Sequence, residues 1–193
     1  MAKGKLILAP CGSGKTTWLS KLSKSEGEMI RDGDNLLLWG KISNRNIFWY
    51  SSEKYKEERK RIKEIFAVYL LEGYSILYSG NPLLMADLGE MVIVMPPASV
   101  RWERLNTRKL AGEWCPSREQ FQMEEDAYNT AIEGLGVRVV LGDLPDVGDL
   151  LGLKPRVPPP VSIPQSHLDL LNSIDLPPFV PDLQRPLSPW RSL

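Results

Sequence analysis

The most constraining feature of this sequence is a glycine-bearing loop between a short apolar run and a helical pattern, within residues 5–17. The apolar run that follows Lys5 predicts a buried strand, and residues 15–17 lead into a helical pattern. Gly12 and Gly14 allow the tight backbone turn in which successive N–H groups point inward. A loop of this kind, followed by the positive end of a helix dipole, is typical of a site for phosphate groups.

Residues 9–17, the predicted phosphate-binding loop, suggest distinct roles for their side chains. Lys15 would reach the β- and γ-phosphates of a nucleoside triphosphate, and the Thr16 hydroxyl would ligate Mg²⁺. The full pattern begins with glycine, and here the small residue Ala9 takes that position. We therefore expect ATP and Mg²⁺ as cofactors. The candidate nucleotide-binding residues are Cys11, Gly12, Ser13, Gly14, Lys15, Thr16 and Thr17.

Length and composition narrow the class of protein. The 193 residues suffice for one α/β domain with a substantial core. The 24 basic and 24 acidic residues balance, which argues against a nucleic-acid or membrane-surface partner. Two cysteines make no disulfide framework, and we expect neither a signal peptide nor a membrane span. A cytoplasmic location fits these observations best.

Strand and helix patterns alternate along most of the chain. This alternation predicts a parallel sheet with right-handed crossovers and a ligand site at the carboxyl ends of the strands. The aromatic-rich residues 36–50 have no clear period, so loops and short helical pieces are expected there. Strands are expected at residues 5–9, 29–31, 75–78, 91–95 and 137–141, and helices at 17–24, 53–72, 83–88, 99–110 and 118–135.

The composition changes near residue 154. Ten of the sixteen prolines lie in residues 154–193, and periodicity fades there. This predicts a folded domain over residues 1–153 and a proline-rich, disordered tail over 154–193. The tail could dock on a protein partner, although a plain tail is the simpler interpretation.

Charged side chains follow the second and fourth predicted strands. Asp32 and Asp34 come directly after residues 29–31, where a carboxylate can orient a substrate hydroxyl or hold Mg²⁺ through water. The alternative is an Asp-Gly turn in which Asp34 caps a helix. Arginines at 101, 104 and 108 share one helix face, which could neutralise a transferring phosphoryl group or could be a solvated basic face.

The sequence resembles the P-loop kinases of small molecules, which include nucleoside monophosphate, adenylylsulfate, gluconate and shikimate kinases. The resemblance is carried by residues 9–17, by Asp32-Gly33-Asp34-Asn35 and by residues 97–108, and it covers about residues 5–152. It implies a three-layer P-loop α/β sandwich with a central five-stranded parallel sheet in the order 2-3-1-4-5 and helices on both faces. It also implies a mobile lid-like region at about residues 98–120.

The resemblance implies an ATP-dependent kinase that transfers the γ-phosphoryl group to a small acceptor, such as a nucleotide or a related hydroxyl or phosphate compound. The implied catalytic residues are Lys15, Asp34, Asp32, Arg104 and Arg108. Thr16 would ligate Mg²⁺, with Asp32 contributing through water.

One residue departs from the family pattern. Nucleoside monophosphate kinases often have Asp-Gly after the third strand, and this chain has Ser79-Gly80. Either Asp32 or Asp34 then supplies the missing carboxylate, or catalysis is impaired. The backbone N–H groups of Ser79 and Gly80 could instead hold a substrate phosphate.

Three alternatives stay open at this stage. A kinase-fold adaptor would retain nucleotide binding and recruit partners through the proline-rich tail, and the serine at position 79 favours it. A helicase-like or motor NTPase would need an apolar strand ending in Asp-Glu, which neither residues 77–80 nor 94–97 supply. A polynucleotide end kinase would share the loop and the aspartate, but the neutral net charge argues against a long nucleic-acid substrate.

Overall fold

A computed structural model describes residues 4–39 and 55–152 of the chain. Its centre is a five-stranded sheet in the order β2-β3-β1-β4-β5, with every neighbouring pair parallel. This confirms the expected α/β sandwich and strand order. The strands are β1 (Leu6–Leu8), β2 (Ile30–Asp32), β3 (Ser75–Tyr78), β4 (Met91–Met95) and β5 (Arg138–Leu141).

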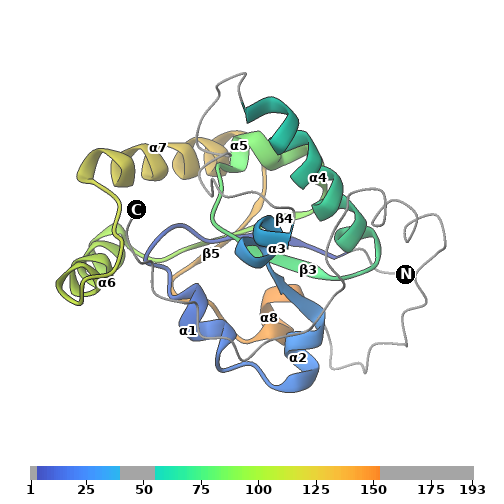
Figure 1. Cartoon of the computed structure of the whole chain (residues 1–193), viewed down its shortest axis with the longest axis horizontal. Coiled ribbons are helices and arrows are strands. Elements are labelled where there is room, and N and C mark those ends of the chain that lie inside the picture. Colours follow the sequence, from blue (N-terminus) through green and yellow to red (C-terminus); the bar gives the residue numbers. More distant parts are fainter. Residues whose placement is uncertain (1–3, 40–54, 153–193) are drawn as a thin grey trace.

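Helices cover both faces of the sheet (Figure 1). On one face, Phe66 and Tyr128 pack with Tyr78 of the sheet, and on the other, Leu150 packs with Ile7 and Val94. The first face carries α3 (Gly33–Trp39), α4 (Lys56–Leu71), α5 (Pro82–Met85), the 3₁₀ turn η2 (Ala86–Leu88) and α7 (Arg118–Gly134). The second carries α1 (Lys15–Leu19), α2 (Lys24–Met29) and α8 (Val147–Leu151).

The sequence pattern of the strands follows from this double cover. The three inner strands are buried along almost their whole length, so they read as continuous apolar runs rather than as alternating ones. The edge strand β5 is only partly buried, with Arg138 and Leu141 exposed. The layers therefore explain why strand positions could be predicted from short apolar runs.

One predicted helix was wrong, and one observed helix was not predicted. The helix expected over residues 17–24 ends at Leu19, and a separate helix, α2, begins at Lys24. Its start is a capping box, in which the Ser23 hydroxyl accepts from the Glu26 N–H and the Glu26 carboxylate accepts from the Ser23 N–H. The sequence also gave no expectation for α8, because five residues are too short to show a helical period.

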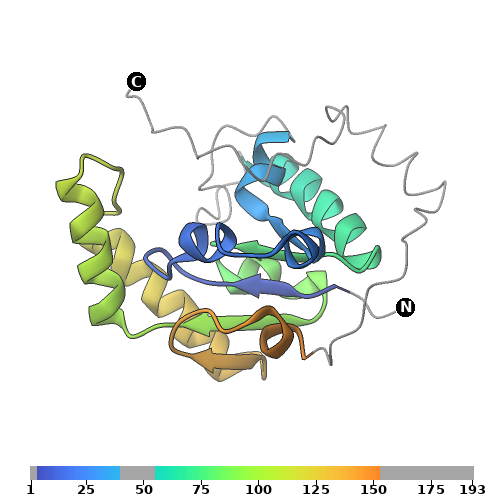
Figure 2. The same cartoon turned by 90° about the horizontal axis from the view of Figure 1, so that it is seen from below.

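Helix α6 (Ala98–Leu110) lies at the end of the sheet where the loop after β1 also lies (Figure 2). The two are in contact, because a Cβ atom added at Gly12 would lie 2.7 Å from the Arg101 carbonyl oxygen. The fold thus brings the start of α6 against the predicted phosphate-binding loop.

Part of the aromatic-rich stretch at 36–50 and the whole of the predicted tail at 154–193 lie outside the described residues. The domain boundary near residue 153 therefore stays a prediction. Within the described ranges, none of the helices combines the length and the apolar character needed to cross a membrane.

The packing of α8 can be tested with one substitution. Leu150 is fully buried against the sheet, so Leu150→Ala should lower the free energy of unfolding by about 2–5 kcal/mol, as measured by urea denaturation. The matched control is Leu110→Ala, because Leu110 is 90% exposed and its truncation should change stability by about 0.5 kcal/mol or less. Equal effects of the two substitutions would contradict the place of α8 in the core.

Candidate functional site

The loop after β1 has the backbone conformation that its glycines predict. Gly12 and Gly14 adopt left-handed φ angles of 79° and 81°. The Ser13 N–H closes a turn onto the Pro10 carbonyl at 3.2 Å. Helix α1 begins at Lys15 directly after this turn, so the first N–H groups of the helix lack acceptors within it. These donors are available to an anion at the loop.

Two side chains of the loop fit a phosphate ligand. Lys15 folds back over the loop, where its Nζ donates to the carbonyl oxygens of Ala9 at 2.8 Å and Pro10 at 3.1 Å. The Ser13 hydroxyl is buried and finds no hydrogen-bond partner among the residues that the structure describes. A buried hydroxyl without a protein partner and a lysine on backbone carbonyls are groups that could each bind a phosphate oxygen. Thr16 and Thr17 are exposed at the start of α1.

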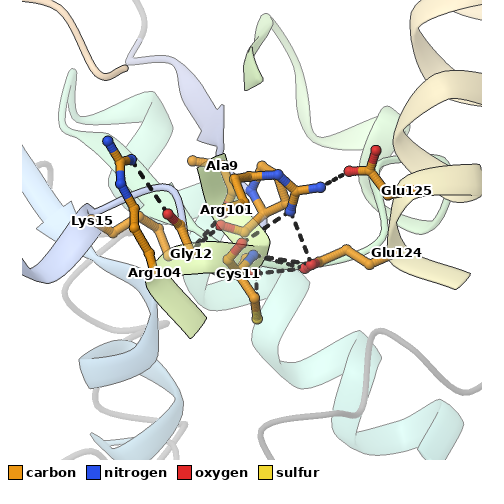
Figure 3. Close-up of polar contacts among 10 residues, drawn as sticks. Ala9, Cys11, Gly12, Lys15, Arg101, Arg104, Glu124 and Glu125 are labelled. Carbon is orange, nitrogen blue, oxygen red and sulfur yellow. Dashed lines mark hydrogen bonds and ion pairs between the residues drawn. The ribbon is translucent and has the colours of Figure 1, made fainter. Parts of the chain in front are cut away.

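The peptide groups of Cys11 are held from both sides (Figure 3). The Cys11 N–H donates to both carboxylate oxygens of Glu124 on α7, at 3.0 and 3.1 Å. The Cys11 carbonyl accepts from Nη1 of Arg101 on α6 at 2.9 Å. The conformation of the loop therefore depends on two helices that lie far from it in sequence.

Arg101 and Glu124 also contact each other, with Nη1 of the arginine 3.4 Å from Oε2 of the glutamate. A second ion pair joins Nη2 of Arg101 to Oε1 of Glu125 (Figure 3). The Arg101 side chain is 0% exposed and that of Glu124 only 5%. Burial lowers the pKa of Arg101, and the negative charge of Glu124 opposes this shift. Each buried charge thus depends on the other.

The Cys11 thiol is neutral at physiological pH. Burial, and then the negative charge of Glu124, raises its pKa from the ordinary value of 9.0 to about 12. Its Sγ lies 3.8 Å from the hydroxyl oxygen of Ser79. The thiol therefore occupies the space between the loop and β3 as an uncharged, weakly polar group.

The three arginines of α6 occupy three different environments. Arg101 is buried beneath the loop, as described. Arg104 lies beside the loop, with Nη1 3.5 Å from the Gly12 carbonyl, and forms a two-pronged ion pair with Asp143 at 2.8 and 2.9 Å. That hydrogen bonding raises the pKa of Arg104 and lowers the pKa of Asp143. Arg108 is exposed and pairs with Glu113 at 2.9 Å. The three arginines keep the spacing of one helix face on α6, but only Arg101 and Arg104 contact the loop.

The two predicted aspartates lie at the end of β2. The Asp34 N–H donates to Oδ1 of Asp32 at 3.0 Å, at the start of α3. Asp32, rather than Asp34, thus caps the turn in the alternative interpretation. The parallel register pairs Asp32 with Leu77 of β3, so the aspartates lie at the same edge of the sheet as Ser79 and the loop.

Ser79 lies directly after β3, and its hydroxyl donates to Oε1 of Glu124 at 3.2 Å. Glu124, Glu125 and Asp143 were not predicted from the sequence. One signal for Glu124 was available: it falls at the helical spacing of the buried residues Phe121 and Tyr128, where an apolar residue would be expected. A carboxylate on the core face of a helix needs a partner, and only the fold shows that the partners are Arg101 and the loop.

The residues of the loop are compatible with a bound Mg²⁺ ion. Within residues 4–39 and 55–152, no group of three or more His, Cys, Asp or Glu side chains forms a direct metal site. A Mg²⁺ ion held by the Thr16 hydroxyl, phosphate oxygens and waters needs no such group.

Solved structures of two small-molecule kinases are similar to this chain. The shikimate kinase from Acinetobacter baumannii in complex with shikimate is similar, with a TM-score of 0.51 and 13% sequence identity over 90% of this chain and 94% of that chain. A gluconokinase from Sinorhizobium meliloti 1021 aligns with a TM-score of 0.43 and 15% identity over 78% of this chain and 88% of that chain.

No protein-family model matches this chain, and a comparison with curated proteins finds no match either. The likeness to the shikimate kinase is one of fold, because the identity is low. The chain shares the fold of this shikimate kinase, which agrees with the predicted resemblance at the level of fold.

The contact between Gly12 and Arg101 gives a matched pair of substitutions. Gly12 and Gly112 have nearly equal φ angles of 79° and 78°, so alanine at either position meets the same left-handed strain of about 1–2 kcal/mol. Only at Gly12 would the new Cβ approach backbone atoms, whereas nothing lies within 4 Å at Gly112. Gly12→Ala should therefore lower the free energy of unfolding in urea by about 1–3 kcal/mol more than Gly112→Ala. Equal losses would contradict the packing of the loop on α6.

The raised pKa of Cys11 gives a pH dependence with a defined sign. Between pH 9 and about 12 the folded thiol keeps its proton while the unfolded thiol loses it, so stability falls as the pH rises. From pH 8 to pH 10, the free energy of unfolding of the wild type should fall by about 1.4 kcal/mol more than that of Cys11→Ala. Urea denaturation at both pH values measures this, and parallel losses in the two proteins would show that Cys11 titrates normally.

Proposed function

We propose that this chain is an ATP-dependent phosphotransferase that transfers the γ-phosphoryl group to a small acceptor, a nucleotide or a related hydroxyl or phosphate compound. The observation that carries the proposal is the loop after β1, where two left-handed glycines precede Lys15 at the start of a helix. The shared fold with P-loop small-molecule kinases supports it as an analogy.

The proposed nucleotide site uses residues that are already close together. The N–H groups around Gly12, Gly14 and the start of α1 would donate to the phosphates. The Lys15 ammonium would leave the carbonyl oxygens of Ala9 and Pro10 and bind phosphate oxygens instead. Thr16 would hold Mg²⁺, with Asp32 contributing through water. When bound, Mg²⁺ would neutralise charge on the β- and γ-phosphate oxygens.

The acceptor is proposed to lie at the ends of β2 and β3. There, Asp34 or Asp32 would orient a hydroxyl and take its proton. The acceptor oxygen would bond to the γ-phosphorus as the bond from that phosphorus to the bridging oxygen breaks, leaving ADP. This assignment rests on the strand register, which sets the aspartates, Ser79 and the loop along one edge of the sheet.

Arg104 and Arg108 are the proposed stabilisers of the transferring group. Arg104 already lies beside the loop, which supports its role. Arg108 would have to leave Glu113, as a residue of a lid-like region at about 98–120 would on closing. We further propose a cytoplasmic location, and a protein partner for residues 154–193 stays a prediction of the sequence.

The proposal is tested by turnover of the full chain with Mg²⁺ and ATP. The acceptor panel contains nucleoside monophosphates, nucleosides, and small sugars, polyols and hydroxy acids. We expect transfer to at least one acceptor, and Lys15→Ala should lower kcat by about 10²- to 10³-fold because charge on the phosphates loses its fixed partner. Lys21→Ala, an exposed lysine just beyond α1, is the matched control and should leave turnover unchanged.

Two further outcomes separate the alternatives. ATP binding by calorimetry without transfer to any acceptor would rule out the kinase and favour the adaptor. Unchanged turnover in both Asp32→Asn and Asp34→Asn would show that neither aspartate orients the acceptor.

A further inference from the structure

Helix α7 brings a buried carboxylate to the end of β3, where the sequence has only a serine. Glu124 is 4% exposed and lies against the loop. Its Oε1 accepts from the Cys11 N–H at 3.0 Å and from the Ser79 hydroxyl at 3.2 Å, and its Oε2 accepts from the Cys11 N–H at 3.1 Å. One carboxylate therefore joins the phosphate-binding loop to the end of β3.

The orientation of this carboxylate is fixed from behind. Nη1 of Arg101 lies 3.4 Å from Oε2 of Glu124 and also donates to the Cys11 carbonyl at 2.9 Å. Glu125 pairs with the other end of the same guanidinium (Figure 3). Arg101 is fully buried and pairs with both Glu124 and Glu125, so its guanidinium is held in place. Because Glu124 pairs with this fixed group, its carboxylate has little freedom to rotate away from Ser79.

This arrangement fixes the direction of the Ser79 hydroxyl. A carboxylate only accepts hydrogen bonds, so Ser79 must donate its single proton to Glu124. The neutral Cys11 thiol, 3.8 Å away, can donate to one lone pair of the serine oxygen, and the other lone pair is left for a ligand. Ser79 is half-buried, and the strand order β2-β3-β1 sets it between Asp32 and the loop. A group that binds there must itself donate a hydrogen bond.

We infer that Glu124 is a positioning residue that holds Ser79 as a hydrogen-bond acceptor for the hydroxyl group of the phosphoryl acceptor. The inference rests on the proposed function and narrows its substrate class to compounds that offer a neutral hydroxyl. A phosphate acceptor is disfavoured, since its oxygens would meet the lone pairs of Ser79 and the negative charge of Glu124. The proton lost in transfer still goes to Asp32 or Asp34, so Glu124 acts only through Ser79 and the loop.

The substitution Glu124→Gln reverses the hydrogen bond without changing the shape of the side chain. The amide oxygen can still accept from the Cys11 N–H, but the amide nitrogen now donates to Ser79, whose proton must turn outward. We expect kcat/KM for the best hydroxyl acceptor of the panel to fall by about 10- to 100-fold. The Kd for Mg·ATP, measured by calorimetry, should stay within about threefold because the loop keeps its contact.

A second substitution moves the carboxylate to β3. Ser79→Asp alone sets two carboxylates side by side and should lower kcat/KM strongly. Combined with Glu124→Gln, the new carboxylate can accept from the amide, so the double variant should recover at least about tenfold in kcat/KM over Glu124→Gln. A merely structural role for Glu124 would not produce this recovery. Glu133→Gln, an exposed site on the same helix, is the control and should behave as the wild type.

Four results would overturn the inference. They are wild-type kcat/KM in Glu124→Gln, a loss of ATP affinity in the same proportion as turnover, a weaker apparent affinity for Mg²⁺ with unchanged acceptor kinetics, and a wild-type preference for nucleoside monophosphates over phosphate-free hydroxyl acceptors. Failure of the proposed function would be seen in the wild type alone, as ATP binding without transfer to the panel or to water. That result would also remove the role of Ser79.

Discussion

The conformation of the phosphate-binding loop depends on one buried interaction, the pairing of Arg101 with Glu124 around the peptide groups of Cys11. The arginine holds the Cys11 carbonyl at 2.9 Å, and the glutamate holds its N–H at 3.0 and 3.1 Å. Removing Arg101 would leave the buried carboxylate of Glu124 without its counter-ion, which is far more destabilising than losing a surface ion pair. Neutralising Glu124 alone costs less, because Arg101 stays paired with Glu125. Glycine 12 then fits against the backbone of Arg101, where a larger residue would collide.

The sheet order explains why so few elements can build the site. With the strands in the order β2-β3-β1-β4-β5, the carboxyl ends of β2, β3 and β1 set Asp32, Ser79 and the loop side by side. The helices α6 and α7 then supply Arg101, Arg104 and Glu124 from the other side of the loop. The candidate site thus combines the carboxyl ends of three strands with α6, which lies within the predicted lid-like region, and with α7, which begins at its end.

Much of the fold was predictable because its signals are local. The apolar runs of β3 and β4 fixed two strands to the residue, and the alternation of strands and helices fixed the parallel sheet. The Ser23–Glu26 capping box was also a local signal for the start of α2, but the prediction for this segment rested on helical periodicity alone. Helix α8 gave no period at all, since it spans only five residues and owes its stability to burial of Leu150.

The site was less predictable because its key contacts span long sequence separations. Spacing alone predicted that Arg101, Arg104 and Arg108 would share one helix face. In the structure Arg101 is buried, Arg104 lies beside the Gly12 carbonyl and Arg108 pairs with Glu113, so their environments differ. Glu124 lies 113 residues from Cys11, so no local pattern could join them. The loop itself was predictable, because phosphate binding requires its glycines and lysine within one short segment.

The most direct test of the account is a crystal structure of the chain with Mg²⁺ and a non-hydrolysable ATP analogue. We predict the triphosphate on the N–H groups around Gly12, Gly14 and the start of α1, with Lys15 moved from the Ala9 and Pro10 carbonyls to phosphate oxygens. Glu124 should keep its contacts with Cys11 and Ser79. An analogue bound elsewhere, with Lys15 still on the two carbonyls, would contradict the account.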